Sequence, residues 1–249
     1  MSDDRKLSRR DAIRMLAAAG GGLLLIECGP IKPPPGERSD YDWTKHRWGY
    51  AIDTTRCIGC CACMRACRAE NGVPKGCFRT WIERYEIDAQ DQVHVDAATS
   101  DNFVFKPTGV QADKAFFVPK MCNHCEKSVC NQVCPVGAAY RTKDGVVLVD
   151  HGRCIGCAYC VQACPYGSRF INPELHMADK CTWCYHRITK GMLPACVQAC
   201  PREARIFGDL ADPKSRISVI LKQKRYRVLK PEMGTHPKCF YLGLDREVV

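Results

Sequence analysis

Residues 154–165 read CIGCAYCVQACP, and residues 57–67 read CIGCCACMRAC. Both stretches space their cysteines as C-x2-C-x2-C-x3-C, and two further groups have the related spacings C-x2-C-x4-C-x3-C and C-x2-C-x11-C-x3-C. The chain has 20 cysteines in 249 residues, so thiol chemistry organises the molecule. In chain order the groups are Cys57, Cys60, Cys63 and Cys67; Cys122, Cys125, Cys130 and Cys134; Cys154, Cys157, Cys160 and Cys164; and Cys181, Cys184, Cys196 and Cys200.

Three kinds of chemistry use cysteines at this density: disulfides, structural zinc and iron–sulfur clusters. Thiols this close in sequence would form strained small loops as disulfides rather than long-range links. Zinc ribbons use C-x2-C pairs, but not a third cysteine two residues on and a fourth before a proline. The spacing favours iron–sulfur clusters, with zinc as an alternative that suits the 181–200 group best because of its long interior gap.

The fourth cysteine of each group is expected to bind a different cluster from the first three. Three cysteines in a tight loop surround one face of a cubane and point backbone N–H groups at its sulfurs, and Gly59 and Gly156 permit this close approach. The last two cysteines lie four apart on one face of a helical turn. Two-cluster bacterial ferredoxins have this spacing followed by proline, and Pro135, Pro165 and Pro201 stand at that position here.

The expected fold class is α+β, with two ferredoxin-like two-cluster modules, one nested in the other in sequence. Residues 118–170 form the inner module, with a hairpin that turns at Asp144-Gly145 and continues as a strand over 146–149. The first and fourth cysteine groups flank this module. Residues 48–70 and 171–210 are therefore expected to form the outer module.

Two further segments complete the expected body. Residues 71–117 carry the strand-like stretches TWIERYEI, QVHV and NFVF and are interpreted as a β-rich insertion. Residues 211–249 are interpreted as a C-terminal docking tail, a helix followed by an extended segment. Asp212 as N-cap and Pro213 at the first helical position predict where this helix begins, and it should end near Lys224.

The N-terminus, residues 1–28, is interpreted as a twin-arginine export signal. The pair in Ser8-Arg9-Arg10 precedes a mildly apolar stretch over 15–26, which is too short to span a bilayer. An amphipathic first helix is the alternative, and a run of three glycines disfavours it. Whether the signal is cleaved, lipidated at Cys28 or retained stays open. Residues 29–47 form a Pro-rich linker.

The formal net charge of +10 does not by itself indicate a nucleic-acid partner. Four cubane clusters with all-thiolate ligands would add about −8 and leave about +2. No basic run is interleaved with stacking aromatic residues, so nucleic-acid binding is not expected. The sequence also shows no nucleophile elbow, phosphate loop or paired carboxylate motif, so we do not expect catalysis by the protein itself.

The order of the four groups, with CNHC, DKCTWC…PACVQACP and DPKSRIS…VLKPEMGTHPKCFYLGL, resembles a known family. The family comprises the four-cluster ferredoxin-like electron-transfer subunits of membrane-associated molybdenum oxidoreductases and related quinone-linked complexes. Its members include the tetrathionate, polysulfide and dimethyl sulfoxide reductase types, the cytochrome-nitrite-reductase type and the periplasmic subunit of the sulfate-reducer transmembrane complex. The resemblance runs from about Trp48 to the C-terminus.

This resemblance implies four [4Fe–4S] clusters, each with three cysteines from one group and one from another. The implied sets are Cys57, Cys60, Cys63 and Cys200 (cluster 1); Cys181, Cys184, Cys196 and Cys67 (cluster 2); Cys122, Cys125, Cys130 and Cys164 (cluster 3); and Cys154, Cys157, Cys160 and Cys134 (cluster 4).

Three residues beside these ligands carry further predictions. Cys61 is interpreted as a small buried residue rather than a competing ligand, and Arg68 replaces the proline after Cys67, so the first helix should run further. His124 would tune the cluster of the second group through an N–H to sulfur, or fill space beside the loop.

The implied function is single-electron transfer between an integral-membrane quinone-interacting subunit and a catalytic molybdopterin or cytochrome subunit. The chain would act on the periplasmic side of the cytoplasmic membrane, as a peripheral subunit exported by the twin-arginine route. The alternatives are a free-standing soluble periplasmic polyferredoxin and a structural zinc scaffold. The substrate of the complex and the direction of electron flow are not readable from this chain.

Overall fold

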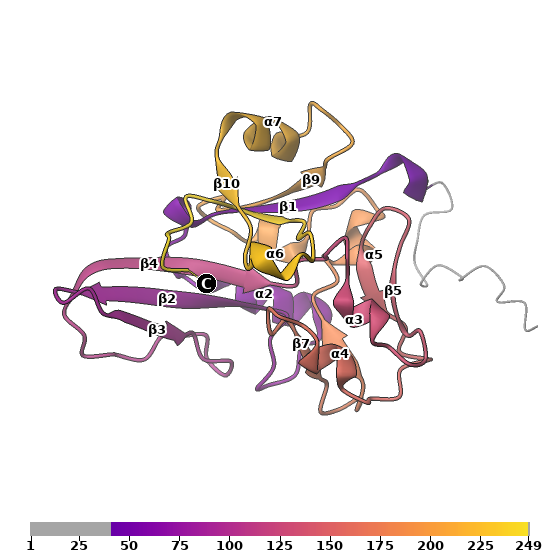
Figure 1. The fold of residues 1–249 in the computed structure, drawn as a ribbon, viewed down its shortest axis with the longest axis horizontal. Helices are drawn as coiled ribbons and strands as arrows, with labels where there is room; N and C mark the ends of the chain where they lie inside the picture. Colours follow the sequence, from indigo (N-terminus) through magenta and orange to yellow (C-terminus); the bar gives the residue numbers. More distant parts are fainter. Residues whose placement is uncertain (1–40, 249) are drawn as a thin grey trace, which may run out of the picture. The chain divides into compact units, whose positions relative to one another are not determined.

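The computed structural model describes residues 41–248. Its secondary structure is mixed, with four small sheets and short helices, which agrees with the α+β prediction (Figure 1). The α-helices are α2 (Ala62–Asn71), α3 (Val129–Gln132), α4 (Tyr159–Gln162), α5 (Tyr185–Ile188), α6 (Ala195–Gln198) and α7 (Arg216–Gln223). Three 3-10 turns accompany them, η1 (Trp43–Lys45), η2 (Thr54–Arg56) and η3 (Pro231–Met233).

The largest sheet joins segments from both ends of the described chain. Its strand order is β10-β11-β1-β9, and the strands are β1 (Trp48–Asp53), β9 (Arg205–Asp209), β10 (Tyr226–Arg227) and β11 (Cys239–Leu242). Strand β1 pairs antiparallel with β9 and parallel with β11. The segment before the first cysteine group therefore lies beside the segment after the fourth.

The predicted β-rich insertion contains a three-stranded antiparallel sheet of order β3-β2-β4. Its strands are β2 (Thr80–Asp88), β3 (Val93–Ala97) and β4 (Ala112–Met121), which lie away from α3 and α4 in Figure 1. TWIERYEI and QVHV fall on β2 and β3 as predicted. NFVF was predicted as a strand and is not one. Its backbone turns at Phe103, where φ is 57°, and the amide of Thr99 closes the turn by donating to the Val104 carbonyl at 2.8 Å.

Three cysteine groups share one local arrangement, in which a short helix carries the third cysteine and a strand begins five residues after the fourth. The strands that begin in this way are β5 (Ala139–Arg141), β7 (Arg169–Ile171) and β9. Strand β5 pairs with β6 (Val147–Val149) across the predicted Asp144-Gly145 turn, and β7 pairs with β8 (Ala178–Lys180). The first group differs, because its helix α2 continues to Asn71. This longer helix was predicted from Arg68, which stands where the other three groups have a proline.

The C-terminal segment begins differently from the prediction. The N-cap of α7 is Ser215, whose Oγ accepts from the Ser218 amide at 3.3 Å, and not Asp212. The Asp212 carboxylate accepts instead from the Lys214 amide at 2.8 Å, which makes a turn before the helix. The segment after α7 was predicted to be extended, and β10 and β11 are strands of the largest sheet. Its role in partner docking stays a prediction. Cys239 and Tyr241 in β11 are fully buried.

The export signal and most of the linker lie outside the described residues, so their interpretation stays a prediction. The division of the body into nested modules also stays a prediction, and β4 crosses the expected boundary between residues 117 and 118. Within residues 41–248 no helix has the length and apolar character needed to cross a membrane.

Candidate metal centres

The first cysteine group shares a cavity with one cysteine from the fourth group. Cys57, Cys60, Cys63 and Cys200 line a small cavity, together with the apolar side chains of Ile58, Ala62, Ile82, Pro119, Pro201 and Ala204. Helix α2 supplies Cys63, and the turn after α6 supplies Cys200. The two helices pack together, which brings residues far apart in sequence to one site.

The third cysteine group has a matching cavity. Cys154, Cys157, Cys160 and Cys134 line a small cavity among Val136, Ala138, Ala139, Val149, Ile155 and Ala178. Here α3 and α4 pack against each other, and the turn after α3 presents Cys134. The two cavities have nearly the same volume and the same donor set, so each would suit the same kind of group.

The other two predicted sets are also brought together. Burial raises the pKa of the Cys67 thiol, and the nearby thiols of Cys196 and Cys184 raise it further. The pKa of the Cys181 thiol is raised well above its usual value by burial and by Cys67 and Cys196. The Asn71 amide nitrogen lies 3.7 Å from Cys67 Sγ and 3.6 Å from Cys184 Sγ, so it bridges α2 and the fourth group.

In the second group, Cys125 lies among the thiols of Cys122, Cys130 and Cys164. Burial raises the pKa of Cys125 to about 12; the Thr235 side chain opposes that rise, and the three thiols add to it. Burial and Cys122 likewise raise the pKa of Cys164. The structure therefore brings Cys164 of the third group to the second group.

Thiols of one set also shift the pKa of thiols in another set, which indicates which sets are neighbours. The thiol of Cys196 adds to the rise that burial causes in the pKa of Cys63, and Cys122 adds to the rise at Cys181. The sets that contain Cys63, Cys181 and Cys122 are thus adjacent in that order. Arg169 lines the cavity of the third group and adjoins Cys130 of the second, so the remaining set follows.

Backbone N–H groups point at several of these sulfurs. The amides of Ala139, Ala178 and Ala204 donate to Cys134, Cys154 and Cys200 at 3.5, 3.4 and 3.3 Å. Burial alone would raise the pKa of the Cys134 thiol, but the N–H groups of residues 136–139 outweigh it, so that the pKa is lowered. Such donors stabilise negative charge on sulfur, which is the charge that a metal-bound thiolate carries.

The donor set fits an iron–sulfur cluster. Each set is all-thiol, a ligand type that suits iron–sulfur clusters, zinc and copper(I). A multi-iron cluster needs a cavity between its ligands, and two sets line one. Beside the third-group cavity, the three guanidinium nitrogens of Arg169 are buried without a hydrogen-bond partner. An anionic group in the cavity would satisfy them. No three His, Cys, Asp or Glu side chains of residues 41–248 are grouped closely enough for a single metal ion.

His124 and Cys61 are both buried. His124 is fully buried, its Nδ1 accepts from the Val147 amide at 3.0 Å, and its ring stacks on Trp183 with centroids 4.0 Å apart. Burial holds its pKa well below the usual value, and Lys180 lowers it further. The ring thus fills space in the core. Because Nδ1 accepts, Nε2 carries the hydrogen, and within residues 41–248 it is buried without a hydrogen-bond partner, so its donation to a cluster sulfur stays a prediction. Cys61 is buried as expected, and its Sγ donates to the Gly59 carbonyl at 3.3 Å.

Three buried cations near the cysteines were not identified from the sequence. They are Arg205, Lys180 and Arg169, which are 2 %, 1 % and 4 % exposed. A sequence signal exists for two of them, because the third and fourth groups both continue as Cys-Pro-x3-Arg. Lys180 directly precedes the first cysteine of its group and has no comparable signal.

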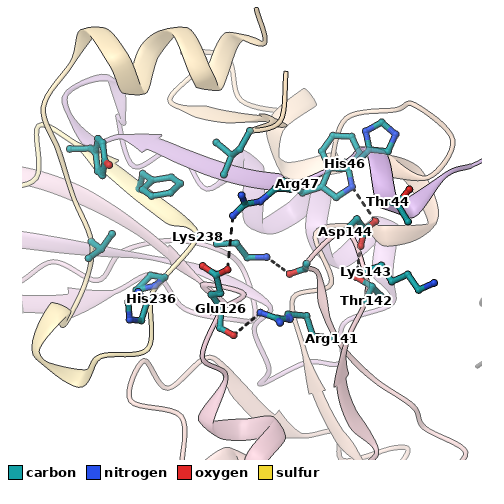
Figure 2. A pocket seen from close by; sticks show the side chains of 17 residues that line it. Thr44, His46, Arg47, Glu126, Arg141, Thr142, Lys143, Asp144, His236 and Lys238 are labelled. Atoms are coloured by element: carbon teal, nitrogen blue, oxygen red, sulfur yellow. Dashed lines mark hydrogen bonds and ion pairs between the residues drawn. The ribbon is translucent and has the colours of Figure 1, made fainter. Parts of the chain in front are cut away.

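A broad open cavity elsewhere contains none of these cysteines. It measures about 1790 Å³ and is lined from η1 and β1, from the turn between β5 and β6, and from the C-terminal segment (Figure 2). Arg47 lies 4.0 Å from the Glu126 carboxylate, Arg141 donates to the Glu126 carbonyl at 2.7 Å, and Lys238 donates to the Gly145 carbonyl. These cations are held by acceptors of the same chain, so the metal-ligand chemistry lies in the smaller cavities.

Comparisons with known proteins agree with this donor set. The family described as "4Fe-4S dicluster domain" matches residues 113–210, which include the second, third and fourth groups. A tetrathionate reductase subunit of Salmonella typhimurium is 43% identical over 96% of this chain and 89% of its own length. The chain belongs to this family of iron–sulfur electron-transfer subunits.

Other members are similar over most of the chain. Protein NrfC of Escherichia coli is 42% identical over 78% of this chain and 79% of its own. Hdr-like menaquinol oxidoreductase iron-sulfur subunit 1 of Archaeoglobus fulgidus is 32% identical over 97% of this chain and 100% of its own. Membership makes the chain an electron-transfer component of an oxidoreductase complex, not a catalytic subunit.

Proposed function

We propose that this chain holds four [4Fe–4S] clusters in a row and passes single electrons along them. The row would connect an integral-membrane quinone-interacting subunit with a catalytic molybdopterin or cytochrome subunit. When bound, each cluster would accept and release one electron. The sixteen cysteines would hold the clusters in the four sets that the family resemblance implies, and their backbone N–H donors would stabilise the sulfur charge.

One observation carries this proposal: each of the two cavities takes its fourth cysteine from another group. Cys200 reaches the first group, and Cys134 reaches the third. A single-group metal site would need no such exchange. Exchange fixes the separation of two clusters, because the third and fourth cysteines of one group bind different clusters four residues apart. In α2 both of these cysteines, Cys63 and Cys67, lie on the same helix.

The relatives support the proposed partners. The name of one contains "menaquinol oxidoreductase", and that of another contains "tetrathionate reductase". A member of such a complex needs one electron donor and one acceptor, which a row of clusters can serve at its two ends. The twin-arginine pair supports action on the periplasmic side of the membrane, after export.

The test is iron analysis and redox-titrated EPR of the anaerobically purified chain. We expect about sixteen iron atoms per chain, four for each set. Cys134→Ser should alter the cluster on Cys154, Cys157 and Cys160, whereas Cys130→Ser, the matched control four residues earlier in the same group, should alter the cluster on Cys122 and Cys125.

The opposite result for this pair would overturn the exchange of ligands. A protein with zinc and no iron would overturn electron transfer itself. Affinity purification from membranes tests the partners: a membrane subunit and a catalytic subunit should accompany the chain. Recovery of the loaded chain alone would favour a free-standing polyferredoxin.

A further inference from the structure

Three cationic side chains are buried where successive cysteine sets meet. Within residues 41–248, Arg205, Lys180 and Arg169 form no ion pair with an aspartate or glutamate, although each is at most 4 % exposed. Burial of an uncompensated charge is costly. Each of these cations therefore needs negative charge from a neighbour other than a carboxylate.

Arg205 joins the first set to the second. It lines the cavity of Cys57, Cys60, Cys63 and Cys200. Its Nη1 lies 3.4 Å from the Tyr50 hydroxyl, which in turn lies 3.2 Å from Cys196 Sγ in the second set. Its Nη2 donates to Thr80 Oγ1 at 2.8 Å, so the guanidinium is held in one position.

Lys180 lies between the second set and the third. Its Nζ donates to the Cys181 carbonyl at 2.7 Å and to the Val147 carbonyl. Cys181 belongs to the second set. On the other side, the Val147 amide donates to His124 Nδ1 at 3.0 Å, and His124 lies in the loop between Cys122 and Cys125 of the third set.

Arg169 lies between the third set and the fourth. It lines the cavity of Cys134, Cys154, Cys157 and Cys160. The hydroxyl of its neighbour Ser168 donates at 3.1 Å to the carbonyl of Met121, which directly precedes Cys122 of the third set. Among residues 41–248 the buried guanidinium nitrogens of Arg169 have no nitrogen or oxygen partner, and the Cys160 thiol lies beside them. Arg169 and Arg205 occupy equivalent places, each the first residue of the strand five positions after a fourth cysteine.

We propose that these three buried cations set the reduction potentials of the clusters, each raising the potentials of the two clusters that it lies between. This inference rests on the four ligand sets proposed above. Reduction adds one electron from the donor partner to an already anionic cluster. A fixed positive charge in a low-dielectric interior favours that step. No bond forms or breaks, and the guanidinium groups keep their protons. Burial lowers the pKa of the Lys180 ammonium, and the negative charge of the Cys122 and Cys181 sulfurs opposes that fall.

The experiment is a redox titration by EPR of the iron-loaded chain and its Arg205→Gln, Lys180→Gln and Arg169→Gln variants. Each variant should lower the reduction equilibrium constant of its two flanking clusters about tenfold, which is about 59 mV for a one-electron couple. The other two clusters should change less than about twofold. Arg205→Lys and Arg169→Lys keep the charge and should restore most of the potential. Lys45→Gln, at an exposed position, is the control and should change nothing.

Iron content separates the two proposals. Wild-type protein without four clusters would overturn the proposed function. Variants with full iron content and unchanged potentials would overturn the role of the cations and leave the function intact. If a Gln variant does not retain iron, the salt dependence of the wild-type clusters still tests the role of the buried cations. Buried charges are weakly screened, so the reduction equilibrium constants of the wild-type clusters should stay within about twofold between about 0.05 M and 0.5 M salt. A change of about tenfold would assign the tuning to surface cations and overturn the inference.

Discussion

At the scale of single residues, the cysteine loops depend on glycine where the backbone is left-handed and crowded. Gly156, in the loop of the third group, has φ of 70°, and a Cβ there would lie 2.4 Å from the His176 carbonyl oxygen. Gly137, in the turn after Cys134, has φ of 62° but open space around it. At both positions a side chain would strain the left-handed backbone, but only at Gly156 would its Cβ also clash with a neighbouring atom.

This difference predicts a larger effect at Gly156. Gly137→Ala should destabilise the iron-loaded protein by about 1–2 kcal/mol through its left-handed backbone alone. Gly156→Ala should cost at least about 1 kcal/mol more, because a backbone carbonyl must move. Denaturant unfolding followed by circular dichroism, with loss of the visible absorbance, measures both. Equal effects would show that the contact with His176 is unimportant.

At the scale of elements, the N-cap of α7 is Ser215, three residues after the N-cap that the sequence pattern predicts. Asp212-Pro213 is a favourable N-cap and N1 pair, yet Pro213 belongs to a turn. Ser215 is the cap because its hydroxyl also donates to the Asp209 carbonyl at 2.5 Å. That carbonyl belongs to β9, so the strand end selects which residue begins the helix.

We expect Ser215→Ala to destabilise the protein by about 1 kcal/mol through loss of the cap. Asp212→Ala should cost roughly 0.5 kcal/mol or less, as an exposed substitution outside the helix. Chemical denaturation midpoints compare the two variants directly. A larger loss of stability for Asp212→Ala than for Ser215→Ala would show that Asp212 is the N-cap, as predicted from the sequence.

At the scale of the whole molecule, the C-terminal segment completes the sheet that carries the first cysteine group. Strand β11 pairs in parallel with β1. The Tyr241 hydroxyl donates to the Pro119 carbonyl at 3.1 Å, which ties this strand to β4. Thr54, next to the first group, donates to the Leu242 carbonyl at 3.0 Å. This segment is thus part of the folded core, and its predicted role in partner docking would come in addition.

Truncation separates the two roles. A chain that ends at Lys224 loses β10 and β11 and exposes the edge of β1, so we expect it to lose iron and to aggregate. A docking tail alone would leave a folded, iron-loaded chain that fails to bind partners. A chain that ends at Asp245 keeps both strands and should remain folded. Size-exclusion chromatography with iron analysis reads out both truncations.

Local spacing determined much of this protein from the sequence alone. The four cysteine groups, the turn at Asp144-Gly145, β2, β3 and the longer α2 could all be predicted, because each depends on residues within a few positions of one another. Covalent geometry limits what such close neighbours can do. The family resemblance added the ligand sets, which spacing alone left open.

Tertiary structure decided what depends on contacts across the chain. Only packing of α2 on α6 and of α3 on α4 brings Cys200 to Cys57 and Cys134 to Cys154. Only the sheet shows that β11 pairs with the edge of β1, since parallel pairing of distant strands leaves no local signal in the sequence. Packing also decided where the three buried cations lie. The Cys-Pro-x3-Arg repeat marks Arg169 and Arg205 in the sequence, but it does not show that they are buried between two thiol sets. Burial is a property of the assembled core.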